Sequence, residues 1–147
     1  MGTGVGDVCH FSTLFSTPLK DPSGLGAGIS ATAFNRHGIE TTIVEIDPAV
    51  YDAARLYFGL PDHPPENLFI EDARAWAAKR RASIGIGKPL PPFDIAVHDC
   101  FSGGGVPEHI YTVEFWDDLK AALHPEGVLV VVRFTVSISL LSNLVTF

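Results

Sequence analysis

Hydrophobic and polar positions follow two alternating patterns between Gly24 and Phe134. Short apolar runs recur along this part of the chain, and stretches with apolar residues at helical spacing separate them. The runs expected to be strands are Thr41–Ile46, Leu68–Ile70, Phe93–Val97 and Val128–Phe134. The stretches expected to be helices are Ile29–Arg36, Pro48–Phe58, Ala73–Arg81 and Thr112–Leu123. Strands that alternate with helices form parallel sheets, so the pattern predicts an α/β, Rossmann-like domain whose mostly parallel sheet is flanked by helices.

The start of the domain fits this pattern less well. A glycine-rich turn at Gly24, Gly26 and Gly28 precedes the first expected helix, and such a turn normally follows directly from a buried strand. Val8–Phe15 has the composition of a strand, but Thr17–Ser23 contains two prolines and separates it from the turn. We therefore expect the first strand to be missing, displaced or degraded, and residues 1–22 to form an irregular leader.

The C-terminal end is also atypical. We expect the domain to span residues 23–134, to be incomplete, and to be followed by an apolar tail of uncertain structure at residues 135–147. Val128–Phe147 is long enough to raise the question of a membrane span, with Arg133 as its only charged side chain. The favoured interpretation is a buried core strand followed by a loose end, because the preceding helix and the turn at Pro125–Gly127 predict that strand independently.

Composition limits the range of functions. The 147 residues suffice for one domain but are few for a complete doubly wound one, and 46% hydrophobic with 18% charged residues predicts a packed interior. A net charge of -7 argues against a nucleic-acid partner and favours a small-molecule or basic substrate. Cys9 and Cys100 lack metal-ligand spacing, so neither a zinc site nor a disulfide framework is expected. With no secretory signal at the N-terminus, the default expectation is a cytoplasmic protein.

The stretch Ser23–Asp47 has the features of a nucleoside pocket. Its glycines allow a tight turn and a close approach of ligand to backbone, and the helix that follows presents unpaired N–H groups. An acidic side chain at the end of the next strand accepts hydrogen bonds from ribose hydroxyls, and both Glu45 and Asp47 stand at that position. Asp72 and Asp99 follow the next two apolar runs, although Asp72 is equally well placed to cap a helix.

Four blocks carry a family resemblance: GLGAGISATAF, IVEIDPAVYDAARLYFGL, EDARAW and FDIAVHDCFSGGGVPEHIYTVEFWDDLKAALHPEGVLVV. In this order, and with acidic residues at successive strand ends, they resemble the spermidine synthase-like branch of the class I S-adenosylmethionine-dependent methyltransferase superfamily. The resemblance covers Gly24 to about Val132. It implies S-adenosylmethionine, or decarboxylated S-adenosylmethionine, as the cofactor.

The resemblance also implies a role for each candidate site residue. The glycines of the turn lie beneath the amino-acid part of the ligand, Glu45 takes the ribose hydroxyls, and Asp47 is a neighbour on the adenosine side. Asp72 and Ala73 meet the edge of the adenine. Asp99 faces the reactive sulfonium or the incoming amine and is the candidate catalytic residue. The implied ligand-binding residues are therefore Gly24, Gly26, Gly28, Glu45, Asp47, Asp72, Ala73 and Asp99.

One departure from the family pattern changes the expected reaction. Spermidine synthases carry a second aspartate three residues after the strand-end one, and this chain has Ser102 there. A serine without a partner is not a base near neutral pH, so we favour methyl transfer over aminopropyl transfer to a polyamine. The expected acceptor is an amine or other small nucleophile, on a small molecule or on a protein, and a homodimer is compatible with the sequence. A non-catalytic or truncated family member is the third alternative.

The remaining polar and aromatic candidates keep two interpretations each. His98 and Cys100 flank Asp99, but no further partner for a covalent nucleophile is evident, so ordinary core positions are favoured. His109 and Tyr111 are substrate contacts or surface groups. Trp76 and Trp116 are expected to be core residues of helices.

Overall fold

The protein is an α/β domain, seen in a computed structural model that describes residues 8–12, 25–87, 90–100 and 107–132. These residues form a sheet of five strands, all parallel, in the order β3-β2-β1-β4-β5. The strands are β1 (Val8–Ser12), β2 (Thr41–Glu45), β3 (Leu68–Ile70), β4 (Phe93–His98) and β5 (Leu123–Val131). The helices are α1 (Ile29–Arg36), α2 (Pro48–Phe58), α3 (Ala73–Gly85) and α4 (Val113–Ala122), with short 3-10 turns η1 (Pro65–Asn67) and η2 (Glu108–Ile110). The predicted fold class is confirmed.

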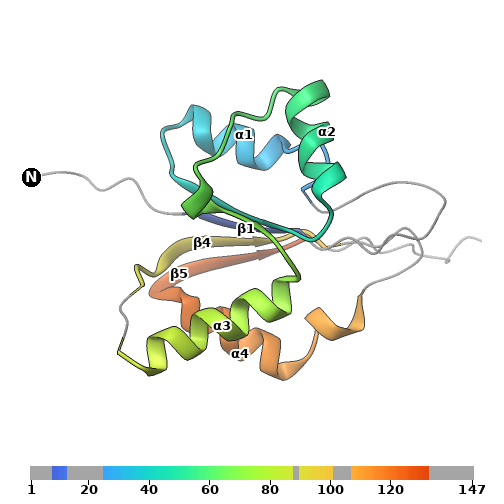
Figure 1. The fold of residues 1–147 in the computed structure, drawn as a ribbon. Coiled ribbons are helices and arrows are strands. Elements are labelled where there is room, and N and C mark those ends of the chain that lie inside the picture. The colour runs from blue at the N-terminus through green and yellow to red at the C-terminus, as the bar shows by residue number, and fades with distance from the viewer. Residues whose placement is uncertain (1–7, 13–24, 88–89, 101–106, 133–147) are drawn as a thin grey trace, which may run out of the picture.

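The helices cover the sheet in two layers. Helices α1 and α2 lie on one face and α3 and α4 on the other (Figure 1). Each face has its own apolar core. The core of the α1/α2 face contains Leu25, Ala31, Ile43, Val50, Tyr51, Ala54 and Leu60. The core of the α3/α4 face contains Val44, Ala73, Trp76, Ala77, Phe93, Ala96, Cys100, Ile110, Phe115, Leu119 and Ala122, with Trp116 packed against it. Trp76 and Trp116 are therefore core residues of helices, as expected.

The central strand is β1, which corrects one expectation. Val8–Ser12 pairs in parallel with β2 on one side, from Val8 opposite Thr41 to Ser12 opposite Glu45, and with β4 on the other. The first strand is thus displaced along the sequence and not missing, and residues 1–22 are not wholly an irregular leader. The prolines of Thr17–Ser23 come after the strand ends, so they do not interrupt it. The local sequence of β1 predicts a strand only weakly, and pairing with β2 and β4 stabilises it.

Strand β5 contains an irregularity where the sequence predicted a turn. Phe93 pairs with Leu123, but Ile95 pairs with Val128, so the residues around Pro125–Gly127 bulge out of the ladder. A Cβ atom on Gly127 would lie 2.9 Å from the carbonyl oxygen of His124, which requires glycine there. Helix α4 ends at Ala122, one residue before the expected end. The end of the expected strand Val128–Phe134 and the tail at residues 135–147 lie outside the described residues.

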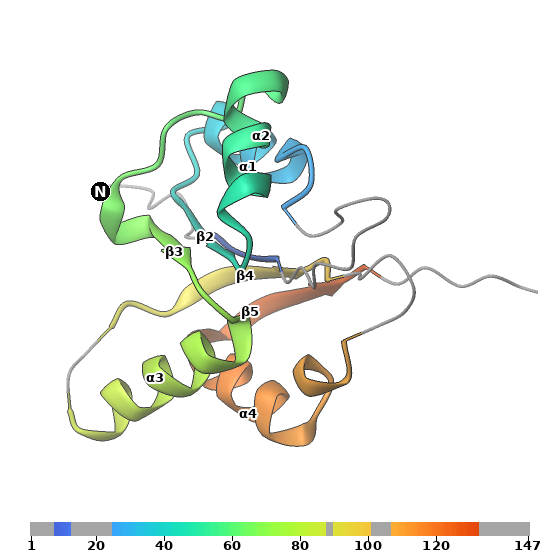
Figure 2. The ribbon, with the colours of Figure 1, turned by 45° about the vertical axis from the view of Figure 1, so that its right-hand side comes forward.

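Helices long and apolar enough to cross a membrane were sought in the described residues, and none was found. Val128–Val131, the described part of the stretch that raised this question, belongs to strand β5. Together, the parallel strands direct their carboxyl ends to one edge of the sheet, and the arrows of β4 and β5 point to the same side in Figure 2. That edge is where open α/β sheets bind ligands.

Candidate functional site

The turn before α1 depends on two glycines. Gly26 and Gly28 adopt φ angles of 53° and 68°, in the left-handed region that favours glycine. The N–H of Gly28 donates to the carbonyl oxygen of Leu25 at 2.7 Å, which closes the turn. A Cβ atom on Gly28 would lie 3.0 Å from Cδ1 of Leu60, so a side chain there would also crowd Leu60. Gly24, the first glycine of the predicted motif, lies outside the described residues.

Glu45 joins this turn to the end of β2. Its side chain is fully buried, and Oε2 accepts a hydrogen bond from the backbone N–H of Leu25 at 3.3 Å. Oε1 accepts from the N–H of Asp47 at 3.0 Å. Burial raises the pKa of Glu45 to about 7, although these backbone hydrogen bonds act in the opposite direction. A carboxylate with this pKa changes charge close to neutral pH.

Asp47 has a different task from Glu45. Its Oδ1 accepts from the N–H of Ala49 at 2.8 Å and caps helix α2, whose first residue is Pro48. Glu45, in contrast, contacts backbone at two places: Oε2 accepts from Leu25 in the glycine turn, and Oε1 accepts from Asp47 itself. The sequence left the two carboxylates as alternatives at one strand end, and the structure gives them separate contacts.

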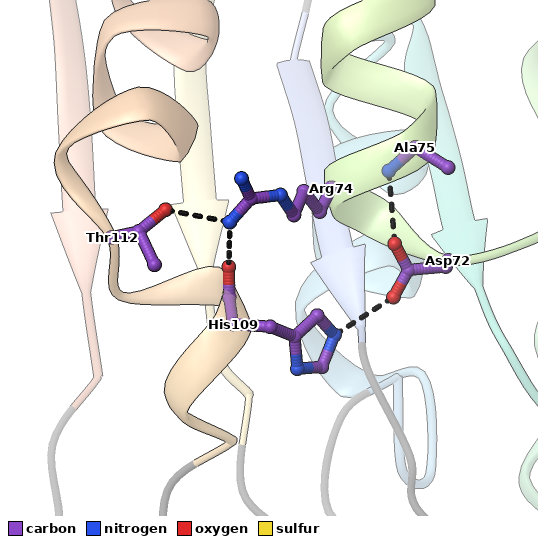
Figure 3. Close-up of polar contacts among 5 residues, drawn as sticks. All are labelled: Asp72, Arg74, Ala75, His109 and Thr112. Carbon is purple, nitrogen blue, oxygen red and sulfur yellow. Dashed lines mark hydrogen bonds and ion pairs between the residues drawn. The ribbon is translucent and has the colours of Figure 1, made fainter.

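Asp72 and Ala73 begin helix α3 at the same edge. Oδ1 of Asp72 accepts from the N–H of Ala75 at 2.9 Å, so Asp72 is the helix cap that the sequence allowed. Its Oδ2 lies 2.8 Å from Nε2 of His109 (Figure 3). Ala73 is fully buried. His109 is therefore a member of this cluster, which the sequence left undecided because the two residues are 37 positions apart.

Asp99 follows the last residue of β4. It is partly buried, and this burial raises the pKa of its carboxyl. The preceding residue, His98, is fully buried among the rings of Tyr111, Phe115 and Trp116, with centroid separations of 4.9, 5.6 and 4.9 Å. Burial is the largest cause acting on His98 and lowers the pKa of its imidazole to about 4. The imidazole is thus neutral near pH 7.

Cys100 is 2% exposed and belongs to the core of the α3/α4 face, so a substrate does not reach its thiol in this structure. Ser102 lies outside the described residues. Over the described part of the chain, no group of three or more His, Cys, Asp or Glu side chains is arranged to hold a metal ion.

A cavity of about 400 Å³ lies away from this edge, beside helix α3. Its lining includes Thr42 near the start of β2 and Phe93 at the start of β4, at the opposite end of these strands from Glu45 and Asp99. In its wall, Glu71 forms an ion pair with Lys79, and Glu40 accepts a hydrogen bond from the side-chain amide of Asn67. The carboxyl edge, where the strand-end carboxylates gather, is therefore the better candidate site.

Comparisons with known proteins point to one superfamily. The chain is 43% identical over 122 residues to an N-terminal histidine N-methyltransferase of Emericella nidulans, and this match covers 82% of the chain. It is 34% identical over 116 residues, or 78% of the chain, to a polyamine aminopropyltransferase of Vibrio vulnificus. No family model matches the chain.

A solved structure shares the fold. The crystal structure of human methyltransferase-like protein 13 in complex with SAH aligns with a TM-score of 0.62 and 23% identity, over 85% of this chain and 53% of that one. These matches confirm the resemblance to the spermidine synthase-like branch of the class I S-adenosylmethionine-dependent methyltransferase superfamily. The chain spans 20% of the length of the Emericella relative and 37% of the Vibrio relative.

Proposed function

We propose that this domain binds S-adenosylmethionine and serves methyl transfer to a nitrogen atom. The observation that carries the proposal is the 43% identity, over most of the chain, to an N-terminal histidine N-methyltransferase. The identity extends over a region that includes the carboxyl edge of the sheet, because it covers 82% of the chain. The resemblance to the methyltransferase superfamily and the carboxylates at the carboxyl edge of the sheet also support methyl transfer.

The residues at the edge fit an adenosyl ligand by their chemistry. Glu45, Asp72 and Asp99 are all hydrogen-bond acceptors, and the ribose hydroxyls, the adenine amino group and a cationic sulfur or amine are their natural counterparts. The carboxylates of Glu45 and Asp72 each already accept two hydrogen bonds, one on each oxygen. A carboxylate offers about four acceptor positions, so lone pairs remain in both. Those of Asp72, whose side chain is 30% exposed, are open to a ligand in this structure, whereas Glu45 is fully buried and becomes accessible only if the turn above it moves. Gly26 and Gly28 keep side chains away from the turn that the ligand would approach.

When bound, S-adenosylmethionine supplies an electrophilic methyl group on a positively charged sulfur. The domain's own contribution is to position the acceptor nitrogen and to take up the proton that the acceptor group releases once the nitrogen carries the methyl group. Asp99 is the candidate for both, since burial raises the pKa of its carboxyl and makes it a stronger base than an exposed aspartate. The rest of the rate enhancement comes from holding the two reactants together.

For the acceptor, we propose the histidine at the N-terminus of another protein. The Emericella relative is an N-terminal histidine N-methyltransferase, and its name gives this substrate for that protein. The nitrogen of a neutral imidazole is a good nucleophile, and it depends less on a general base than a protonated amine does. The net charge of -7 favours a partner with a basic N-terminus.

Aminopropyl transfer from decarboxylated S-adenosylmethionine is the second candidate. The 34% identity to the Vibrio polyamine aminopropyltransferase favours it. Ser102, in the place of the second aspartate of that family, argues against it, since a polyamine nitrogen has to lose a proton before it attacks.

Calorimetric titration distinguishes these functions. We expect the protein to bind S-adenosylmethionine more tightly than its decarboxylated form, with methylthioadenosine weaker than either. The opposite preference would favour aminopropyl transfer, and the absence of heat with all three ligands would show a non-catalytic domain. Mass spectrometry then identifies the acceptor: a peptide that starts with histidine should gain a methyl group, and the same peptide with one glycine added before the histidine should not.

A further inference from the structure

Two contacts hold the carboxylate of Asp72, one on each oxygen. The N–H of Ala75 in helix α3 donates to Oδ1 at 2.9 Å, and Nε2 of His109 lies 2.8 Å from Oδ2. An ionised carboxylate only accepts hydrogen bonds, so Nε2 of His109 carries the proton that is shared. One contact alone would leave the carboxylate free to rotate about its terminal bond. Two contacts on different oxygens fix its plane.

His109 is itself held in place from the start of the same helix. Nη1 of Arg74 donates to the carbonyl oxygen of His109 at 3.0 Å and to Oγ1 of Thr112 at 2.8 Å. Thr112 caps helix α4, so Arg74 ties the beginnings of α3 and α4 together. Figure 3 shows the result: Asp72 and Arg74 reach across from α3 and hold the imidazole and the backbone of His109.

This arrangement lies at the edge of the sheet where the ligand is expected, and it is open to solvent. The side chains of His109 and Asp72 are 32% and 30% exposed, whereas Ala73 between Asp72 and Arg74 is fully buried. A contact that served only the core would be buried. The carboxylate of Asp72 is partly exposed and fixed in its plane, and it has two acceptor positions left for a further donor.

We propose that His109 is a positioning residue for recognition of the nucleobase: its hydrogen bond to Asp72 fixes the carboxylate in the plane in which Asp72 accepts the amino group of adenine. This inference rests on the proposed function, because it requires an adenosyl ligand at this edge. It assigns His109 a role in specificity for adenine and not in the transfer step.

The test compares two probes, S-adenosylhomocysteine and S-inosylhomocysteine, which carries an oxygen in place of the adenine amino group. One hydrogen bond to a charged acceptor corresponds to roughly a 10- to 100-fold preference, so we expect the wild-type protein to prefer the adenosyl probe by about that factor. His109→Ala should reduce the preference to about threefold or less. His109→Gln, which keeps an N–H donor, should restore most of it.

Two further measurements separate specificity from folding. Lys79→Ala removes the partner of Glu71, the residue beside Asp72, and should leave the preference unchanged. Thermal denaturation reports the stability of each variant. If His109→Ala weakens both probes equally, or if His109→Gln restores nothing, the inference is wrong although the proposed function stands. If the wild-type protein binds neither probe, the proposed function fails first.

Discussion

Strands β2 and β4 lie on either side of β1, and each ends in a fully buried polar residue, Glu45 on one and His98 on the other. The two oxygens of Glu45 accept backbone hydrogen bonds from the glycine turn and from Asp47. Among the described residues, neither ring nitrogen of His98 has a hydrogen-bond partner, and three aromatic rings surround the imidazole. Glu45 is thus connected to the candidate ligand site through its polar atoms, whereas His98 fills space as a flat ring.

Burial acts on both groups in favour of the neutral form. It raises the pKa of Glu45 to about 7 and lowers the pKa of His98 to about 4. The comparison teaches that burial alone does not identify a functional residue. The contacts of the polar atoms do, and the two residues should therefore respond differently to substitution, to ligand and to pH.

The largest expected effect is loss of ligand binding in Glu45→Ala. If Glu45 accepts both ribose hydroxyls, two hydrogen bonds to a charged group are lost, which corresponds to roughly a thousandfold weaker affinity for S-adenosylhomocysteine. Isothermal titration calorimetry measures this change. Glu66→Ala, at an exposed position in η1, is the matched control and should bind normally. Unchanged affinity in a folded Glu45→Ala protein would exclude the ribose contact.

The second effect is a dependence of stability on pH that Glu45 causes. The pKa of Glu45 is raised on folding, so its contribution is fully present below about pH 4.5 and is lost as the pH rises through about 7. The shift from 4.5 to about 7 corresponds to about 3 kcal/mol in the free energy of unfolding. Urea denaturation at several pH values should show this decline in the wild-type protein and a much flatter curve in Glu45→Gln. Two parallel curves would contradict the prediction.

The third effect concerns Asp99. We expect Asp99→Asn to lower kcat for methyl transfer about a hundredfold, the lower range for loss of a proton acceptor, with little change in the affinity for S-adenosylmethionine. Asp117→Asn, an exposed carboxylate on α4, serves as the control. A change confined to KM would assign Asp99 to binding of the cofactor or the acceptor, and not to proton transfer.

The smallest effect is expected at His98, on the other side of the comparison. Because its ring nitrogens have no hydrogen-bond partner in the described part of the chain, His98→Phe should change the free energy of unfolding by less than about 1 kcal/mol. The wild-type protein should also lose stability as the pH falls from 6.5 through about 4, and the variant should lose less. A loss above about 2 kcal/mol at pH 7 would show that the imidazole makes a polar contact after all.

Local sequence signals predicted most of the fold and part of the site. The helix boundaries near Gly38, Pro48 and Gly59 follow from backbone conformation, which acts over a few residues. Apolar patterning predicted the ends of β2 and β4 to within one residue of Glu45 and His98. The sequence did not predict that β1 is the central strand, because its role comes from pairing with strands far along the chain. It also left His109 undecided, since its partner Asp72 belongs to another helix start.

The place of β1 also governs how the sheet assembles. Val8 pairs with Thr41 and with Ile95, which are 33 and 87 positions away (41 minus 8 and 95 minus 8). Of the described strands, β1 is made first, and 87 positions separate Val8 from Ile95, so β1 waits for this length of chain before its second neighbour exists. Pairings of such long range slow folding, because the entropy of closing the chain is lost before the contacts form. Until β4 emerges, β1 has one open edge, and the nascent domain exposes it to other chains.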